Sequence, residues 1–182
     1  MDPLVAHQRA QDAFAAVLAN AKPDQLDDPT PCSAWTVRDL IDHVVAGNRM
    51  VVARAGRGED PPPRSDNVAE AHRASAAWAQ ETFAGPEGMS AIYELPFGQV
   101  PGAAFIGMRT TDVLTHAWDL AAATGQSTDL DRELATHALA AAQQAAGAGF
   151  RGPGKPFGEQ QPCPPNRSPA DRLAAFLGRT VG

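Results

Sequence analysis

Apolar residues recur along most of this chain at the three- and four-residue intervals of an α-helix. This spacing predicts helices over 3–20, from 36 to the glycines and prolines at 56–63, and over 67–83, 103–124, 130–148 and 168–177. Start and stop signals agree with these limits. Thr36 and Asp39 have the pattern of a capping box, Asn67 is a good N-cap, and Gly125 is a good residue to follow a helix end.

The segment 90–100 interrupts the helical pattern. It carries Ile92, Tyr93 and Val100 with Pro96 between them, which predicts two short strands or an extended excursion. Strands do not alternate with helices along the chain, so a doubly wound sheet is not expected. We expect an all-α helical bundle with this short insert.

The whole chain, 1–182, is expected to form a single domain. Its last part, 147–182, is interpreted as a tail that ends in a short helix. The stretch 147–165 is rich in glycine and proline, and we interpret it as packed against the bundle rather than as a lid.

The composition excludes several classes of function. Fifteen Lys+Arg residues against 21 Asp+Glu give a formal net charge of −6, and no basic stripe is evident, which argues against nucleic acid and anionic membranes as partners. The chain has neither an apolar run long enough to span a bilayer nor the pattern of a signal peptide. Its two cysteines are too few for a disulfide framework. These features predict a cytoplasmic protein.

The candidate chemistry lies in the helix 103–124. Asp112 and His116 are four residues apart and share one helix face, in line with the apolar side chains of Phe105, Met108 and Leu120. A carboxylate on such a face must be paired or must bind a metal ion. Arg109, three residues earlier, is a candidate either to neutralise Asp112 or to hold an anionic substrate.

His43 is the candidate third ligand. It lies at the edge of the apolar stripe of the second helix, where a histidine without other ligands nearby is usually a hydrogen-bonded core residue. Facing helices of a bundle are 8–10 Å apart, so His43 can complete a set of two histidines and one carboxylate with Asp112 and His116. Such a set suits zinc, nickel, iron or manganese, and its open positions favour catalysis or ligand binding over a structural role.

Three segments resemble one family. The residues 31–43 (PCSAWTVRDLIDH), 109–120 (RTTDVLTHAWDL) and 171–179 (DRLAAFLGR) are similar to motifs of mycothiol-dependent maleylpyruvate isomerase-type proteins, within the DinB-like superfamily of metal-binding proteins. The resemblance covers nearly the whole chain. It implies a DinB-like four-helix bundle in which His43, Asp112 and His116 hold a divalent metal ion, zinc first. The isomerase has Glu where this chain has Asp112, so the ligand arm here is one methylene shorter.

The resemblance also implies what the metal does. A bound cation would activate a small thiol of the mycothiol type for attack on an electrophilic substrate, as in a transferase or an isomerase. The isomerase has a second, C-terminal domain that contributes to its active site, whereas this sequence has room for the first domain and a short tail, so we do not expect isomerisation of maleylpyruvate itself. A non-catalytic binding module and a 2-His-1-carboxylate iron enzyme stay as alternatives, as do a monomer and a homodimer.

The other reactive side chains are interpreted mainly as structural. Asp119, three residues after His116, is a candidate either to orient that histidine or to pack as an ordinary helix acid. His7 and Gln11 are assigned to a solvated face, with the mouth of the cavity as the alternative. The remaining assignments are a structural thiol (Cys32), an inert loop thiol (Cys163), surface histidines (His72, His137) and core anchors (Trp35, Trp118).

Overall fold

A computed structural model describes residues 1–32, 34–55, 65–96, 98–145 and 158–182 of the chain. The elements are α1 (Pro3–Leu18), η1 (Pro23–Gln25), α2 (Val37–Arg54), α3 (Val68–Ala84), β1 (Ile92–Leu95), β2 (Gly98–Pro101), α4 (Gly102–Ala123), α5 (Arg132–Ala145) and α6 (Pro169–Phe176). The predicted all-α class with a short extended insert is confirmed. The stretch 146–157, which holds the predicted end of the fifth helix and most of the Gly/Pro-rich segment, lies outside the described residues.

Local signals set the helix starts as predicted. Thr36 accepts a hydrogen bond from the backbone N–H of Asp39, while the carboxylate of Asp39 accepts one from the backbone N–H of Thr36, so the capping box at the start of α2 is formed. Asn67 caps α3 through the backbone N–H groups of Ala69 and Glu70. These caps fix where α2 and α3 begin, and therefore which of their faces meet the bundle.

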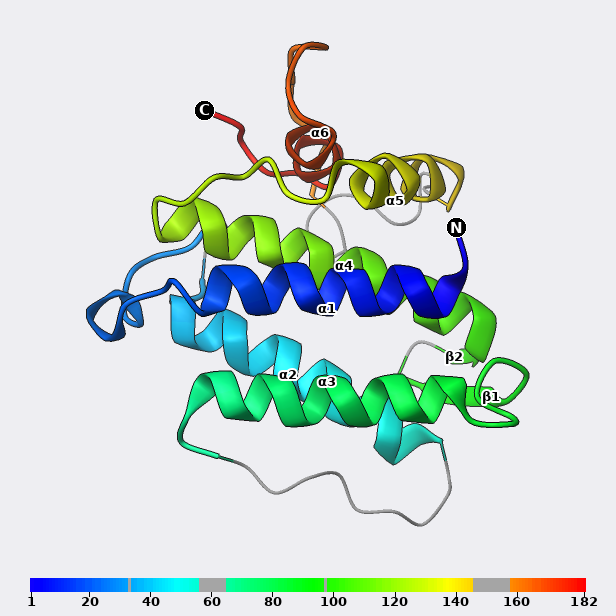
Figure 1. Cartoon of the computed structure of the whole chain (residues 1–182). Coiled ribbons are helices and arrows are strands. Elements are labelled where there is room, and N and C mark those ends of the chain that lie inside the picture. Colours follow the sequence, from blue (N-terminus) through cyan, green and yellow to red (C-terminus); the bar gives the residue numbers. More distant parts are fainter. Residues whose placement is uncertain (33, 56–64, 97, 146–157) are drawn as a thin grey trace.

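Four helices form the bundle. Figure 1 shows α1 lying along α4 on one side and along α3 on the other, while α2 packs against α3 and α4. The helices α5 and α6 pack on each other and on α4. The strands β1 and β2 form an antiparallel hairpin beside the start of α4, with Leu95 paired to Gly98 next to the turn. Pro96 falls in that turn, where its missing N–H costs no ladder bond.

In the part of the chain that the structure describes, the buried apolar side chains form two clusters. The larger one joins α1, the first half of α2, the second half of α4, α5 and α6. The smaller one joins the ends of α2 and α3 to the hairpin and the start of α4. On α2, Asn48 lies between Val44 of the larger cluster and Val51 of the smaller one, and on α4 Arg109 lies between Ile106 and Val113. A polar layer therefore separates the two clusters. Its six residues are His7, Gln11, Asn48, His72, Ser75 and Arg109.

Three side chains of this polar layer were predicted to be exposed, and these predictions are wrong. His72 is 2 % exposed, not a surface residue, and His7 and Gln11, assigned to a solvated face, are 0 % and 2 % exposed. The reason is that α3 covers the side of α1 that carries these polar residues. His137 is exposed, as predicted, and Trp118 is buried, as predicted.

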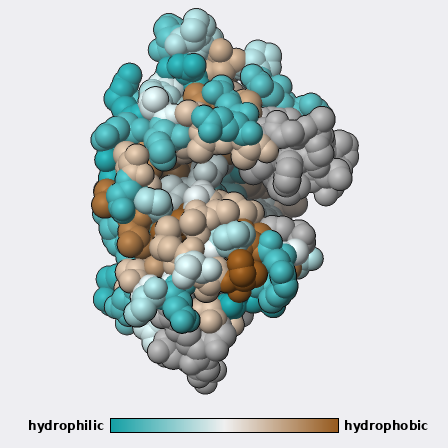
Figure 2. Space-filling view, turned by 90° about the vertical axis from the view of Figure 1, so that its right-hand side faces the viewer, coloured by the Kyte–Doolittle hydropathy of each residue, from teal (hydrophilic) through white to brown (hydrophobic). Residues whose placement is uncertain are grey.

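Among the described residues, the exposed large apolar side chains belong to one end of the molecule, near the start of α1, the hairpin and the first half of α4. They are Met1, Val5, Ile92 and Met108. Figure 2 shows that end of the molecule, with brown atoms in separate places among teal and white ones. Met108 was expected on the buried face of its helix, but it is 45 % exposed because it lies to one side of the stripe that faces α1 and α2.

His7 and His72, the buried histidines whose pKa is lowered, predict a loss of stability in mild acid. Burial lowers the pKa of His7 and of His72 to about 4. The unfolded chain binds protons at these histidines near pH 6.5, whereas the folded chain does so only near pH 4, so stability falls as the pH drops through this window. Between pH 7 and pH 5 we expect a loss of about 2 kcal/mol per histidine in the free energy of unfolding, measured with urea.

The variant His72→Gln keeps a donor for Gln11 but removes one titrating group. It should lose about half of the acid sensitivity, whereas His137→Gln, at an exposed position of α5, should keep all of it. Equal pH dependence in the wild type and in His72→Gln would contradict this explanation.

Candidate metal site

The three predicted ligands come together between α2 and α4. Asp112 Oδ1 lies 3.6 Å from Nε2 of His43 and 3.5 Å from Nε2 of His116. These three donor atoms all lie within 4.8 Å of one another. The helical spacing brings Asp112 and His116 onto one face of α4, and the packing of α2 against α4 brings His43 to them.

The chemistry of this donor set fits a divalent cation. Nε2 of His43 is buried and has no hydrogen-bond partner among the described residues, so it is available as a ligand. Two imidazoles and one carboxylate are the donor set of many zinc and iron sites that keep positions open. The side chains of His43 and Asp112 are 37 % and 32 % exposed, so a small molecule can approach from outside.

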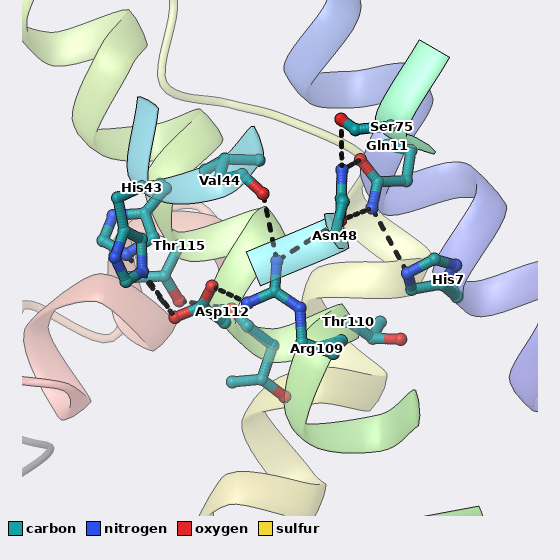
Figure 3. Close-up of polar contacts among 12 residues, drawn as sticks. His7, Gln11, His43, Val44, Asn48, Ser75, Arg109, Thr110, Asp112 and Thr115 are labelled. Atoms are coloured by element: carbon teal, nitrogen blue, oxygen red, sulfur yellow. Dashed lines mark hydrogen bonds and ion pairs between the residues drawn. The ribbon is translucent and has the colours of Figure 1, made fainter. Parts of the chain in front are cut away.

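The carboxylate of Asp112 is ionised. Burial would raise its pKa, but Arg109 and the neighbouring histidines hold the pKa of Asp112 well below its usual range. Nη1 of Arg109 donates to Asp112 Oδ2 at 2.7 Å, so of the two roles considered for Arg109 the geometry supports pairing with Asp112 (Figure 3). This contact uses one carboxylate oxygen and leaves the other facing the imidazoles.

His116 has a second acid on its other side. Its Nδ1 lies 3.0 Å from Oδ2 of Asp119, which is fully buried. Burial lowers the pKa of His116, but the two carboxylates raise it well above its ordinary value. At neutral pH the raised pKa leaves His116 protonated on both ring nitrogens, with Nδ1–H directed at Asp119 and Nε2 directed at Asp112. A metal ion would replace the Nε2 proton, while the Nδ1–H stays directed at Asp119. Of the two roles considered for Asp119, this contact supports the orientation of His116.

Two residues near the site were missed as functional candidates. Cys32, interpreted as structural, lies with Sγ 3.3 Å from Asp119 Oδ2 and 4.0 Å from Nδ1 of His116. Arg179 donates from Nη2 to the same Asp119 oxygen at 2.9 Å and to Cys32 Sγ at 3.3 Å. Arg179 belongs to the segment 171–179 that carried the family resemblance, and that was the available signal for it.

The C-terminal segment reaches the site because α6 is anchored to α4. Asp171 accepts hydrogen bonds from Nε1 of Trp118 and from Oγ1 of Thr128, both at 2.8 Å. After α6 the chain turns at Gly178, where φ is +99°, a value that disfavours any side chain. The turn directs Arg179 back toward Asp119.

Trp35 packs against the larger apolar cluster, as predicted, and also borders the site. Its ring centroid is 4.6 Å from that of His43 and 5.7 Å from that of His116, and the side chain is only half-buried. The loop before α2 folds back through hydrogen bonds between Thr30 and the carbonyl of Trp35. The indole therefore covers one side of the two imidazoles.

Cys32, His116 and Asp119 form a second group with the spacing of metal ligands. Here, however, Arg179 already binds both oxygens of Asp119, at 3.1 Å and 2.9 Å. A cation would have to displace this guanidinium. Of these two groups in the described residues, the one with His43, Asp112 and His116 suits a metal ion better.

None of the helices in the described ranges is long and apolar enough to cross a membrane.

Comparisons with known proteins agree with the resemblance of the three motifs. Two proteins of Mycobacterium tuberculosis, "Uncharacterized protein MT0763" of strain CDC 1551 / Oshkosh and "Uncharacterized protein Rv0738" of strain ATCC 25618 / H37Rv, are each 66 % identical over 181 residues and are matched along their whole length.

The fold is similar to two crystal structures of the mycothiol-dependent maleylpyruvate isomerase. The structure of a histidine-to-alanine mutant has a TM-score of 0.61, and the second structure has a TM-score of 0.59. In both cases the sequence identity is 20 %, and the match covers 80 % of this chain and 72 % of the other. The predicted DinB-like arrangement of helices is confirmed.

The model of the family described as "Mycothiol maleylpyruvate isomerase N-terminal domain" matches residues 7–121, which is more than half of the chain. This match includes all three candidate ligands. The chain belongs to the mycothiol maleylpyruvate isomerase N-terminal domain family.

Proposed function

We propose that this protein binds one divalent metal ion, zinc first, through His43, Asp112 and His116, and that it is a thiol-dependent enzyme of the transferase or isomerase type. The observation that carries the proposal is the convergence of two imidazole nitrogens on one oxygen of an ionised carboxylate, at 3.5 Å and 3.6 Å. The buried Nε2 of His43, without a hydrogen-bond partner among the described residues, adds to it.

The cosubstrate in this proposal is a small thiol of the mycothiol type. Membership of the family supports it, together with the printed name of the structural neighbours. When bound, the metal ion would favour the thiolate, which is the nucleophilic form of a thiol. In a transfer reaction a carbon–sulfur bond then forms to the electrophile, the bond from that carbon to its leaving group breaks, and the thiol proton leaves to solvent. In an isomerisation the thiolate adds to a carbon–carbon double bond, the resulting single bond rotates, and elimination of the thiolate restores the double bond in the other geometry.

The residues of the chain prepare the site in three ways. Asp119 accepts the Nδ1–H of His116 and so directs its Nε2 toward the ligand cluster. Arg179 compensates the buried charge of Asp119. Trp35 covers the imidazoles from one side and limits access of water there. In this proposal the whole chain, 1–182, is one metal-binding domain that works in the cytoplasm, where small thiols are kept reduced.

The first experiment measures metal content. Protein purified without a polyhistidine tag should contain about one zinc, nickel, iron or manganese ion per chain. His116→Ala should lose most of it, because an imidazole ligand is removed. His137→Ala, which removes an exposed histidine from α5, should keep the wild-type content. Full occupancy in a folded His116→Ala protein would contradict the assignment of the site.

The second experiment measures thiol chemistry. Metal-loaded protein should accelerate the conjugation of mycothiol to an electrophile such as an alkyl halide, or the mycothiol-dependent isomerisation of a maleyl substrate. Removal of the metal by a chelator should abolish the rate, and zinc should restore it. A protein that binds metal but accelerates neither reaction would be a non-catalytic binding module. Uptake of oxygen that depends on iron and a cosubstrate would instead identify an iron enzyme.

A further inference from the structure

The two oxygens of Asp112 have different surroundings. Oδ1 faces the imidazoles of His43 and His116 at 3.6 Å and 3.5 Å. Oδ2 accepts a charge-assisted hydrogen bond from Nη1 of Arg109 at 2.7 Å. The two oxygens therefore have different partners: Oδ1 faces the two imidazoles, and Oδ2 is bound by the guanidinium of Arg109.

Arg109 is held in place by α2. Its side chain is 6 % exposed, and its Nη2 lies 3.3 Å from Oδ1 of Asn48 and 3.4 Å from the carbonyl oxygen of Val44. Gly47 leaves room for the guanidinium, because a Cβ atom at that position would overlap it. The close approach of α2 to Arg109 depends on glycine here.

Asn48 is in turn held by its neighbours. Its Oδ1 accepts from Nε2 of Gln11 at 2.8 Å, and its Nδ2 donates to Oε1 of Gln11 at 3.2 Å and to Oγ of Ser75 at 3.4 Å. Gln11 continues the network to Nε2 of His7 and Nε2 of His72. Figure 3 shows this line of contacts from Asp112 through Arg109 and Asn48 to His7. The acceptor that binds Arg109 is thus fixed by α1, α2 and α3.

We propose that Arg109 is a positioning residue that restricts Asp112 to binding the metal through Oδ1 alone, and that Gly47 and Asn48 keep Arg109 in that position. This inference rests on the proposed function, since it concerns the same metal ion. Its consequence is chemical. A carboxylate that binds through one oxygen leaves one more coordination position open than a carboxylate that binds through two, and that position is then available to the thiol or the substrate.

Cobalt is the probe for this proposal, because the visible absorption of protein-bound Co²⁺ weakens as its coordination number rises. Three variants of the full chain are loaded with Co²⁺ beside the wild type. Arg109→Met removes the guanidinium, and Gly47→Ala displaces it while leaving Arg109 in the sequence. Gly107→Ala is the matched control, because Gly107 lies in α4 and a Cβ there would meet nothing within 4 Å.

Arg109→Met and Gly47→Ala should each bind one Co²⁺ ion per chain with a loss of visible absorption relative to the wild type. The two variants should share this altered spectrum, because in both of them Oδ2 is released to the metal. Gly107→Ala should keep the wild-type spectrum. Infrared difference spectra of the carboxylate stretches, with and without metal, should show the same change from one bound oxygen to two.

Wild-type absorption in a folded Arg109→Met protein that binds Co²⁺ would overturn the proposal, whatever happens in Gly47→Ala. Circular dichroism identifies a variant that fails to fold, and Arg109→Met then decides the question if Gly47→Ala is lost. Failure of the wild type itself to bind Co²⁺ has a different meaning, because it would overturn the proposed function and not only the role of Arg109.

Discussion

The buried guanidinium of Arg109 is the constraint on which the middle of the bundle depends. A charge that is removed from water has to be paired and hydrogen-bonded, because an isolated buried charge costs several kcal/mol or more. Asp112 supplies the opposite charge, and Asn48 and the carbonyl of Val44 supply acceptors. The polar layer between the two apolar clusters follows from this requirement. Each of the four bundle helices has to place a polar side chain at the same level along the bundle axis.

The polar layer and the candidate metal site are parts of one network. Asp112 belongs to both, because one of its oxygens meets Arg109 and the other meets His43 and His116. On the other side of His116 there is a second arrangement of this kind. Asp119 contacts the imidazole, and Arg179 compensates the buried charge of Asp119. Asp112 and Asp119 therefore each have their own guanidinium, and the imidazole of His116 lies between the two pairs.

The packing of the polar layer also determines the protonation state of two histidines far from the ligands, His7 and His72. His7 donates from Nδ1 to Gln80 and accepts at Nε2 from the amide of Gln11, which is an arrangement of the neutral imidazole. A second proton on His7 would sit on Nε2 and would point at the N–H of Gln11, so two donors would face each other. This is why a buried histidine in this network stays uncharged, whereas His116, placed between two carboxylates, takes up a proton readily.

Much of the secondary structure could be predicted because it depends on local rules. Helix periodicity, the capping box of Thr36 and Asp39, and the extended insert at 90–100 each involve residues close together in the chain. The pair of Asp112 and His116 is of the same kind, since four residues make one helical turn. The third ligand, His43, needed the geometry of a bundle and a family resemblance, because no local rule connects α2 to α4.

The failed predictions for three polar side chains have one physical origin. His7, Gln11 and His72 were assigned to solvent because polar residues usually lie there, yet each finds a buried partner on another helix. The contacts of Cys32 with Asp119 and of Trp35 with the imidazoles were not predicted, because they come from a loop that folds back before α2. Contacts of this kind join residues that are far apart in the sequence.

The sequence by itself determined the helices, the place of the extended insert, the net charge, the family and three candidate ligands, because periodicity, charge and motif are properties of the chain. Only the tertiary structure decided which oxygen of Asp112 faces the histidines, that Arg109 holds the other oxygen beneath Gly47, and that Arg179 returns from the C-terminal segment to Asp119. These are outcomes of packing, in which every buried charge has to find its partner on a different element.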